Sequence, residues 1–391
     1  MTDKQIIYMD HAATTSTGPK VVSAMLPYFT KQYGNPSSIY SIAQKNRAVI
    51  EECRMNIAKS LNASSGNVYF TAGGTEADNW ALKGCACIHG KGHIITSKIE
   101  HHAILHTCDF LCKHGYDITY LDVDENGLIR PDRVMTSIRK DTIMISVMCA
   151  NNEIGVIEPI KEIGEIARKN NIIFHTDAVQ AYGQIPIDVD ELNIDMLSAS
   201  GHKLGGPKGI GFLYIRKGVN VESFIHGGAQ EGGNRSGTEN VPAIVGLSKA
   251  VEESFKTMDE RAKHEIELRN YMIEKIMKEI PYVRLNGHRI RRLPNNVNMS
   301  FQFVQGEALL VMLDMDGICA SAGSACASGS SSPSHVLLAI GLPDDIAYGA
   351  VRFTLGFENT ISQIDYVVDC LKKHVGKLRE MSPQYEDFCK R

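Results

Sequence analysis

The stretches NIIFHTDAVQ (residues 171–180) and MLSASGHK (residues 196–203) decide the fold class of this chain. Each has a short run of apolar and β-branched residues that ends in polar or small ones, which is typical of a buried strand followed by a turn. The same pattern recurs in NVYFTAGG (67–74), HIITSK (93–98), DITYLDV (117–123), TIMISVMCA (142–150) and GIGFLYIR (209–216), and helical stretches lie between them at residues 21–32, 48–61, 75–90 and 160–170. This alternation predicts a doubly wound, mostly parallel α/β sheet, whose ligands bind beyond the carboxyl ends of the strands.

A second, smaller α/β unit is predicted toward the C-terminus. Residues 256–280 form one long polar and apolar segment, which we expect to be a helix that leads into it. The strands VRLNG (283–287), NNVNMSFQ (295–302) and AVRFTLG (350–356) then alternate with helices around residues 306–317, 333–341 and 361–381. The predicted division is a large domain over residues 16–255 and a small domain over residues 1–15 and 256–391.

The composition is that of a globular protein with room for two domains, since 43% of the 391 residues are hydrophobic and 22% are charged. The 41 basic and 45 acidic residues give a formal net charge of -4, which is too balanced for nucleic acid or an anionic membrane to be the main partner. The N-terminus lacks the pattern of a signal peptide, and no window approaches about 18 uninterrupted apolar residues. We therefore expect a cytoplasmic protein without a membrane span.

Ten cysteines are present, and none forms a C-x-x-C pair with another, which argues against a zinc ribbon or a redox dithiol. Cys326 stands apart because it lies in ASAGSACASGSSSPSHVL (320–337), whose Gly and Ser content is typical of a flexible loop. A thiol in such a setting is reactive only when exposed and ionised. Cys326 is therefore a candidate nucleophile.

Polar residues follow two of the predicted strands in a pattern that suits pyridoxal 5'-phosphate (PLP). Asp177 could cap a helix if it stood alone. Together with Ser200, His202 and Lys203, however, it provides a carboxylate for a pyridinium nitrogen, groups for an anion and an amine for a Schiff base with an aldehyde. Gly74 and Thr75 open a predicted helix, whose free N–H groups suit a phosphate.

Rival motifs are weaker. There is no G-x-x-x-x-G-K-[ST] sequence, and the glycine-rich GGPKGIG (205–211) lacks the G-x-G-x-x-G spacing for a dinucleotide. His102 and His106, with Cys108 and Cys112 beyond them, leave a transition-metal site open as an alternative. His101 is better placed for stacking and acid–base work beside a cofactor.

The chain resembles a cysteine desulfurase of the NifS/IscS type. The resemblance spans nearly the whole chain, through YMDHAATT (8–15), YGNPSS (33–38), FTAGGTEADN (70–79), EHHAIL (100–105), ANNEIG (150–155), HTDAVQ (175–180), SASGHK (198–203), RSGTEN (235–240), GSACASG (323–329), PSHVL (333–337) and VRFTLG (351–356). It implies a PLP enzyme of fold type I that works as a homodimer. Gly232 departs from the pattern, because the family commonly has Arg at that place.

The resemblance also implies a role for each candidate residue. Lys203 matches the Schiff-base lysine and Asp177 the partner of the pyridine nitrogen. The remaining matches are His101 over the ring, Asn152 and Gln180 at the phenolic oxygen, Gly74, Thr75, Ser200 and His202 at the phosphate, Thr238 at the phosphate of the neighbouring subunit, Arg352 at the substrate carboxylate and Asn35 beside the substrate.

The same resemblance implies that Cys326 takes sulfur from L-cysteine as a persulfide, with release of alanine. Lys203 would act as the base at Cα and His101 would take the thiol proton. The implied sulfur acceptor is an Fe–S scaffold protein of the IscU/NifU kind or another acceptor. An aminotransferase or selenocysteine lyase on the same fold, and a non-catalytic sulfur carrier or scaffold protein, are the alternatives.

Overall fold

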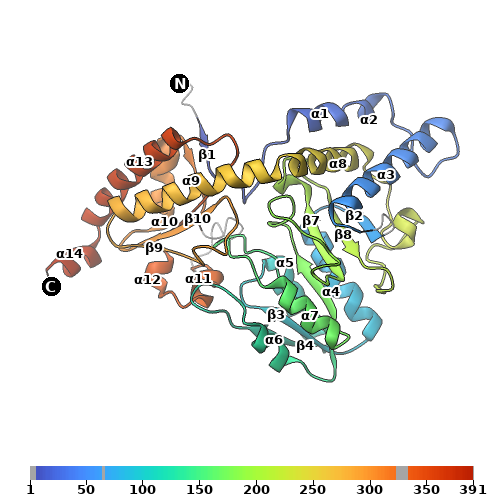
Figure 1. Ribbon diagram of the computed structural model, residues 1–391, viewed down its shortest axis with the longest axis horizontal. Helices are drawn as coiled ribbons and strands as arrows, with labels where there is room; N and C mark the ends of the chain where they lie inside the picture. Colours follow the sequence, from blue (N-terminus) through green and yellow to red (C-terminus); the bar gives the residue numbers. More distant parts are fainter. Residues whose placement is uncertain (1–5, 64–66, 323–332, 391) are drawn as a thin grey trace.

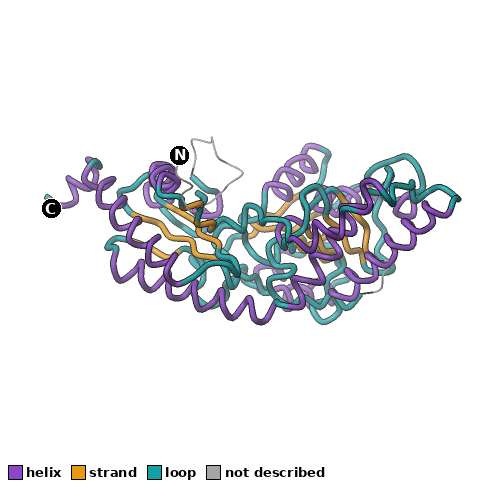
Figure 2. The backbone as a smooth tube through the Cα atoms, turned by 90° about the horizontal axis from the view of Figure 1, so that it is seen from above, coloured by secondary structure: helices purple, strands orange, loops and turns teal. Residues whose placement is uncertain are grey.

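The computed structural model describes residues 6–63, 67–322 and 333–390, so that Cys326 lies outside the described residues. A large body holds the α/β sheet, and a smaller one holds the C-terminal elements (Figure 1). The main sheets of the two bodies lie side by side, each flanked by helices (Figure 2).

The large sheet of the described chain has seven strands in the order β2-β8-β7-β6-β5-β3-β4. Its strands are β2 (Val68–Thr71), β3 (His93–Ser97), β4 (Asp117–Leu121), β5 (Thr142–Ser146), β6 (Ile173–Asp177), β7 (Met196–Ser200) and β8 (Gly211–Ile215). The pairs from β4 to β7 are parallel, while β8 runs antiparallel to both β7 and β2. The predicted mostly parallel sheet is confirmed, and every predicted strand of this region is present.

Helices cover both faces of this sheet, which explains why its central strands β6 and β7 are buried along nearly their whole length. On one face the core includes α3 (Ser41–Ser60), α7 (Ile160–Lys169) and α8 (Val241–Lys256). The other face packs against α4 (Gly74–His89) and α5 (His102–Lys113). The helix predicted over residues 21–32 is divided into α1 (Pro19–Met25) and α2 (Pro27–Thr30), because Pro27 has no N–H to continue α1. A short α6 (Pro131–Ser137) precedes β5.

The smaller body is built on an antiparallel sheet in the order β12-β10-β9, formed by β9 (Val283–Leu285), β10 (Asn296–Phe301) and β12 (Ala350–Thr354). Its helices are α9 (Met258–Glu279), α10 (Gly306–Met315), α11 (His335–Ala339), α12 (Asp344–Ala347), α13 (Ile361–Glu380) and α14 (Pro383–Cys389). The predicted long helix is α9, which runs from the large body to the smaller one in Figure 1. The division at residues 255 and 256 stays a prediction.

The N-terminal segment belongs to the smaller body and then crosses into the larger one. Strand β1 (Ile7–Tyr8) pairs in parallel with β11 (Ile318–Cys319), and Ile7 and Met9 are buried in the same core as β10, β12 and α13. Residues 12–15 then reach the end of β7, where Thr15 N–H donates to the His202 carbonyl at 2.9 Å. Among the described helices, none is long and apolar enough to cross a bilayer.

Candidate active site

A cavity of about 270 Å³ opens at the carboxyl ends of β6 and β7. Ten residues that the sequence singles out line it: Gly74, Thr75, His101, Asn152, Asp177, Gln180, Ser200, His202, Lys203 and Arg352. Parallel strands bring their carboxyl ends to one edge of a sheet, which is why residues far apart in the chain converge here.

Lys203 ends a short 3-10 turn, η2 (Gly201–Lys203), directly after β7. Its ammonium donates to the carbonyl of Ala12, and to that of Ala13 at 2.8 Å. Gln180 Nε2 also donates to the Ala12 carbonyl, at 3.0 Å. The N-terminal segment thus holds two of the predicted cofactor residues in place.

Asp177 is the last residue of β6 and is 5% exposed. Burial raises the pKa of its carboxyl, and the Val179 N–H, which donates to Oδ1 at 2.9 Å, and nearby Lys203 oppose that shift. A cationic ring nitrogen beside this carboxylate would favour its ionised form further. The position therefore suits a partner for a pyridinium.

The N-terminus of α4 faces the ends of β6 and β7. A Cβ atom added to Gly74 would lie 2.5 Å from Val179 Cγ2, so the close approach of this helix end requires glycine. Ser200 and His202 lie on the same side, and His202 Nδ1 is 3.1 Å from Thr14 Oγ1. Burial, with Lys203 and Lys208 nearby, lowers the pKa of His202 to about 4. The N-terminus of the sixteen-residue helix α4 can bind a phosphate dianion. The Ser200 hydroxyl and the neutral His202 imidazole lie beside it and can bind the same phosphate.

His101 caps α5 with its own ring, because Nδ1 accepts a hydrogen bond from the Ala103 N–H at 3.1 Å. Burial lowers the pKa of His101 to about 4, and the positive charge of Lys203 and the neighbouring histidines add to the effect. The ring is therefore neutral at pH 7, as is suitable for a group that stacks on a cofactor.

Arg352 lies on β12 and reaches the cavity from the smaller body. Only 2% of its side chain is exposed, and its terminal nitrogens donate to Asp10 and to the Asn152 carbonyl, each at 2.8 Å. The guanidinium is thus fixed in one plane, with the fork geometry that suits a carboxylate.

Several residues that line the cavity had no predicted role, notably Asp78, Glu153 and His335. Burial raises the pKa of Asp78 well above its usual range, with a further contribution from Asp177. Burial also raises the pKa of Glu153 to about 7, against the influence of Ser334, which donates to it. Both carboxyls lie inside motifs quoted above, but their burial depends on contacts between distant segments.

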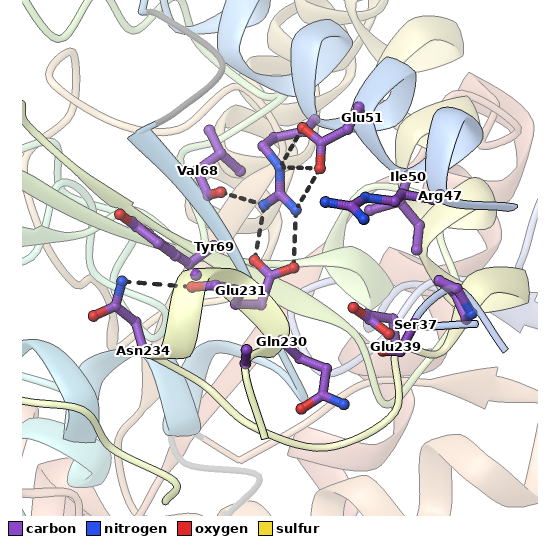
Figure 3. Close-up of a pocket in the computed structure, with 14 residues that line it drawn as sticks. Ser37, Arg47, Ile50, Glu51, Val68, Tyr69, Gln230, Glu231, Asn234 and Glu239 are labelled. Carbon is purple, nitrogen blue, oxygen red and sulfur yellow. Dashed lines mark hydrogen bonds and ion pairs between the residues drawn. The ribbon is translucent and has the colours of Figure 1, made fainter. Parts of the chain in front are cut away.

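Two predicted residues, Asn35 and Thr238, are exposed and do not line this cavity. They lie beside residues of a second, larger cavity of about 570 Å³, shown in Figure 3, whose lining includes Ser37, Gln230 and Glu239. Asn35 and Thr238 keep their predicted roles as predictions.

The second cavity is built around a buried ion pair (Figure 3). Arg54 Nη1 and Nη2 donate to Glu231 Oε2 and Oε1 at 2.7 and 2.9 Å, and the Phe70 N–H donates to Oε2 at 2.9 Å. Glu231, Gly232 and Gly233 have φ values of +49°, +67° and +85°, in the left-handed region. The ion pair stabilises this turn, and Gly232 suits a φ that a side chain would strain.

In the part of the chain that the structure describes, no group of three or more His, Cys, Asp or Glu residues is arranged to hold a metal ion. His102 and His106 instead stack on each other, with ring centroids 4.9 Å apart. Cys108 is buried, which raises the pKa of its thiol.

Comparison with known proteins agrees with this geometry. Residues 7–367 match the family described as aminotransferase class-V. The chain is 53% identical to a cysteine desulfurase IscS of Clostridium botulinum (strain Hall), over 98% of both chains, and 54% identical to one of Methanosarcina thermophila, over 98% of this chain and 95% of that one.

The fold of the chain is also similar to that of solved structures. A NifS-like protein is 36% identical with a TM-score of 0.89, over 95% of this chain and 100% of that one. SspA in complex with cysteine is 39% identical with a TM-score of 0.80, over 89% of this chain and 98% of that one. The chain therefore belongs to the aminotransferase class-V family, among its cysteine desulfurases of the NifS/IscS type.

Proposed function

We propose that this chain removes sulfur from L-cysteine with PLP bound in the 270 Å³ cavity, and that Cys326 carries the sulfur as a persulfide. The observation that supports this best is the convergence of Lys203, Asp177 and Arg352 on that one cavity. They supply an amine, a buried carboxylate and a fixed guanidinium, which are the groups that this reaction needs.

The residues present fit PLP by the chemistry of their donor set. Gly74, Thr75, Ser200 and His202 would hold its phosphate, Asp177 its ring nitrogen, and Asn152 and Gln180 its phenolic oxygen. His101 would stack on its ring, and Lys203 would bind its aldehyde covalently. When bound, the cofactor supplies an electron sink for charge that develops at the substrate Cα.

The chain's own residues orient the substrate and move its protons. Arg352 would bind the L-cysteine carboxylate in two-pronged fashion, while the predicted role of Asn35 beside the substrate stays a prediction. Lys203 would take the Cα proton of the substrate. The Cys326 thiolate then attacks the substrate sulfur, so that an S–S bond forms as the C–S bond breaks, and alanine leaves after reprotonation.

The homodimer, the acceptor protein and the compartment are further parts of this proposal. Thr238 is exposed and would reach the phosphate held by the partner subunit. The persulfide would pass to an Fe–S scaffold protein of the IscU/NifU kind or to another sulfur acceptor in the cytoplasm.

The test is to add L-cysteine and a reductant to purified holoenzyme and to measure alanine and sulfide together. Equal amounts of both support the proposal, whereas alanine without released sulfur contradicts it. Lys203→Ala should abolish both products, and borohydride should link PLP to Lys203 in the unaltered protein. Linkage to another lysine would contradict the assignment of Lys203.

Transamination or selenocysteine cleavage could use the same Lys203 and Asp177. Formation of a keto acid from L-cysteine would favour an aminotransferase, and turnover of L-selenocysteine alone would favour a lyase. A sulfur carrier without catalysis would release no alanine.

A further inference from the structure

Four histidines lie together along one edge of the active-site cavity. His101, His102 and His335 line the cavity, and the exposed His106 stacks on His102. The ring of His335 is 4.8 Å from that of His102, and the ring of His102 is 6.3 Å from that of His101. Their hydrogen bonds distinguish two of these rings, those of His101 and His335.

The bonding of His101 leaves it an N–H donor. A neutral imidazole has one protonated nitrogen and one lone pair. The Ala103 N–H donates to Nδ1 of His101, so the lone pair is on Nδ1 and the proton is on Nε2. A second proton can enter only at Nδ1, where it would break the cap of α5.

The hydrogen bond of His335, in contrast, leaves this ring able to accept a second proton. Its Nε2 lies 3.0 Å from the carbonyl oxygen of Glu100, which can only accept, so Nε2 carries the proton and the lone pair is on Nδ1. A second proton enters at Nδ1 while the bond to Glu100 is kept, and the bond becomes stronger because its donor is then charged.

We propose that His335 accepts, at Nδ1, the proton of the nucleophilic thiol that ionises in this cavity, while His101 presents its Nε2–H as a donor. The S–H bond breaks, an N–H bond forms on His335, and the electron pair stays on sulfur as a thiolate. The inference rests on the proposed function, and it gives to His335 the proton that the sequence resemblance assigned to His101.

The surroundings of His335 keep it neutral and able to accept. Burial lowers its pKa from the usual 6.5, the hydrogen bond to Glu100 opposes this, and His106 adds to it. The titratable groups around it are His101, His102 and His106 on or beside α5, the Glu100 carboxyl, and Glu153, which bonds to the neighbouring Ser334. Burial raises the pKa of Glu100 to about 8, against the hydrogen bonds that Ser97 and the Met148 N–H donate to it.

The tautomers can be measured without catalysis. Long-range ¹H–¹⁵N spectra of the full chain labelled in histidine, assigned with His101→Gln and His335→Gln, should show both rings neutral with the proton on Nε2. They should also show that protonation of His335 follows a higher pKa than that of His101. A proton on Nδ1 of His335 would overturn the inference.

The kinetic test uses His335→Gln in the holoenzyme, because the glutamine amide can still donate to the Glu100 carbonyl but is not a base. The rate of alanine formation should fall about 100-fold, the range of general base catalysis, while PLP binding and the absorbance change on adding L-cysteine are kept. The fall of the wild-type rate at pH values below the lowered pKa of His335 should disappear in the variant. Free imidazole should restore part of the rate of His335→Ala.

His114→Gln is the matched control, since His114 is an exposed histidine at the other end of α5 and does not line the cavity, and its rate should stay within about twofold of wild type. A His335→Gln enzyme that is as fast as wild type overturns the inference. A slow His335→Gln enzyme also overturns it if its pH profile is that of wild type and free imidazole does not restore the rate of His335→Ala. Wild-type protein that makes no alanine would instead contradict the proposed function itself.

Discussion

Arg352 donates through Nη2 to the Asp10 carboxylate at 2.8 Å, although 342 residues separate the two in sequence. A second bond, from Nη1 to the Asn152 carbonyl, fixes the plane of the guanidinium, while its Nε is buried without a hydrogen-bond partner among the residues that the structure describes. The fork is therefore oriented before any substrate arrives, so that little side-chain entropy is lost on binding.

Arg352→Lys should raise KM for L-cysteine about tenfold or more, because a single ammonium cannot keep both existing bonds and also grip a carboxylate at two points. Initial rates of alanine formation over a range of L-cysteine give KM, and PLP absorbance gives cofactor content, which should not change. Arg130→Lys, at an exposed pair with Asp132, is the control and should leave KM as it is. An unchanged KM in Arg352→Lys would remove this residue from substrate binding.

Cys326→Ser should separate the two halves of the chemistry. The variant keeps Lys203, Asp177 and Arg352, so it should bind PLP and still change its absorbance when L-cysteine is added. A serine hydroxyl without a dedicated base is a far poorer nucleophile, so persulfide, alanine and sulfide should fall at least about 100-fold. Wild-type turnover in this variant would mean that another of the ten cysteines is the nucleophile or that the sulfur leaves by direct elimination.

Arg54→Met should lower the free energy of unfolding by about 3–5 kcal/mol, because it leaves the buried Glu231 carboxylate without its partner. The left-handed turn at Glu231 loses its anchor at the same time. Urea unfolding followed by circular dichroism measures the change. Arg130→Met breaks an exposed pair instead and should cost less than about 1 kcal/mol. Equal losses in the two variants would show that the buried Arg54–Glu231 pair contributes no more to the free energy of unfolding than the exposed pair.

Glu265 on α9 makes the stability depend on pH. It is 2% exposed, its Oε2 has no hydrogen-bond partner in the described part of the chain, and Arg261 Nε lies 3.8 Å from Oε1. Burial raises the pKa of this carboxyl to about 8, with Arg261 opposing the shift. The folded protein therefore holds a proton that the unfolded chain has already released, and stability falls as the pH rises from about 4.5 to about 8, by about 1.4 kcal/mol per unit.

Glu265→Gln, which imitates the protonated group, should remove this part of the pH dependence. Compared with wild type at the same pH, the variant should gain most stability near pH 8. Glu267→Gln on the exposed side of the same helix should keep the wild-type slope. Thermal unfolding from pH 5 to 8 measures both. A wild-type slope in Glu265→Gln would show that the carboxyl is ionised in the folded protein.

The strands and half of the site could be predicted because they follow from local pattern. Asp177, Ser200 and Lys203 come directly after apolar runs, and parallel pairing brings such positions together. Asp10 and Glu153 could not be assigned roles, since the first depends on contact with β12 and the second on burial beneath Ser334. His335 was part of a quoted motif, but its tautomer depends on the Glu100 carbonyl, which the sequence does not place.

The path of residues 10–15 also has a consequence for how the enzyme is made. Gln180 and Lys203 can bond to this early segment once the large sheet is made. The Ala12 N–H, however, donates to Thr354 Oγ1 at 2.8 Å and Asp10 pairs with Arg352, so the segment cannot complete its contacts until the ribosome has nearly finished the chain. The large sheet, whose strands all precede residue 216, can form first during synthesis. The floor of the cavity closes last, which means that a truncated product would carry the sheet yet lack a complete pocket for the coenzyme.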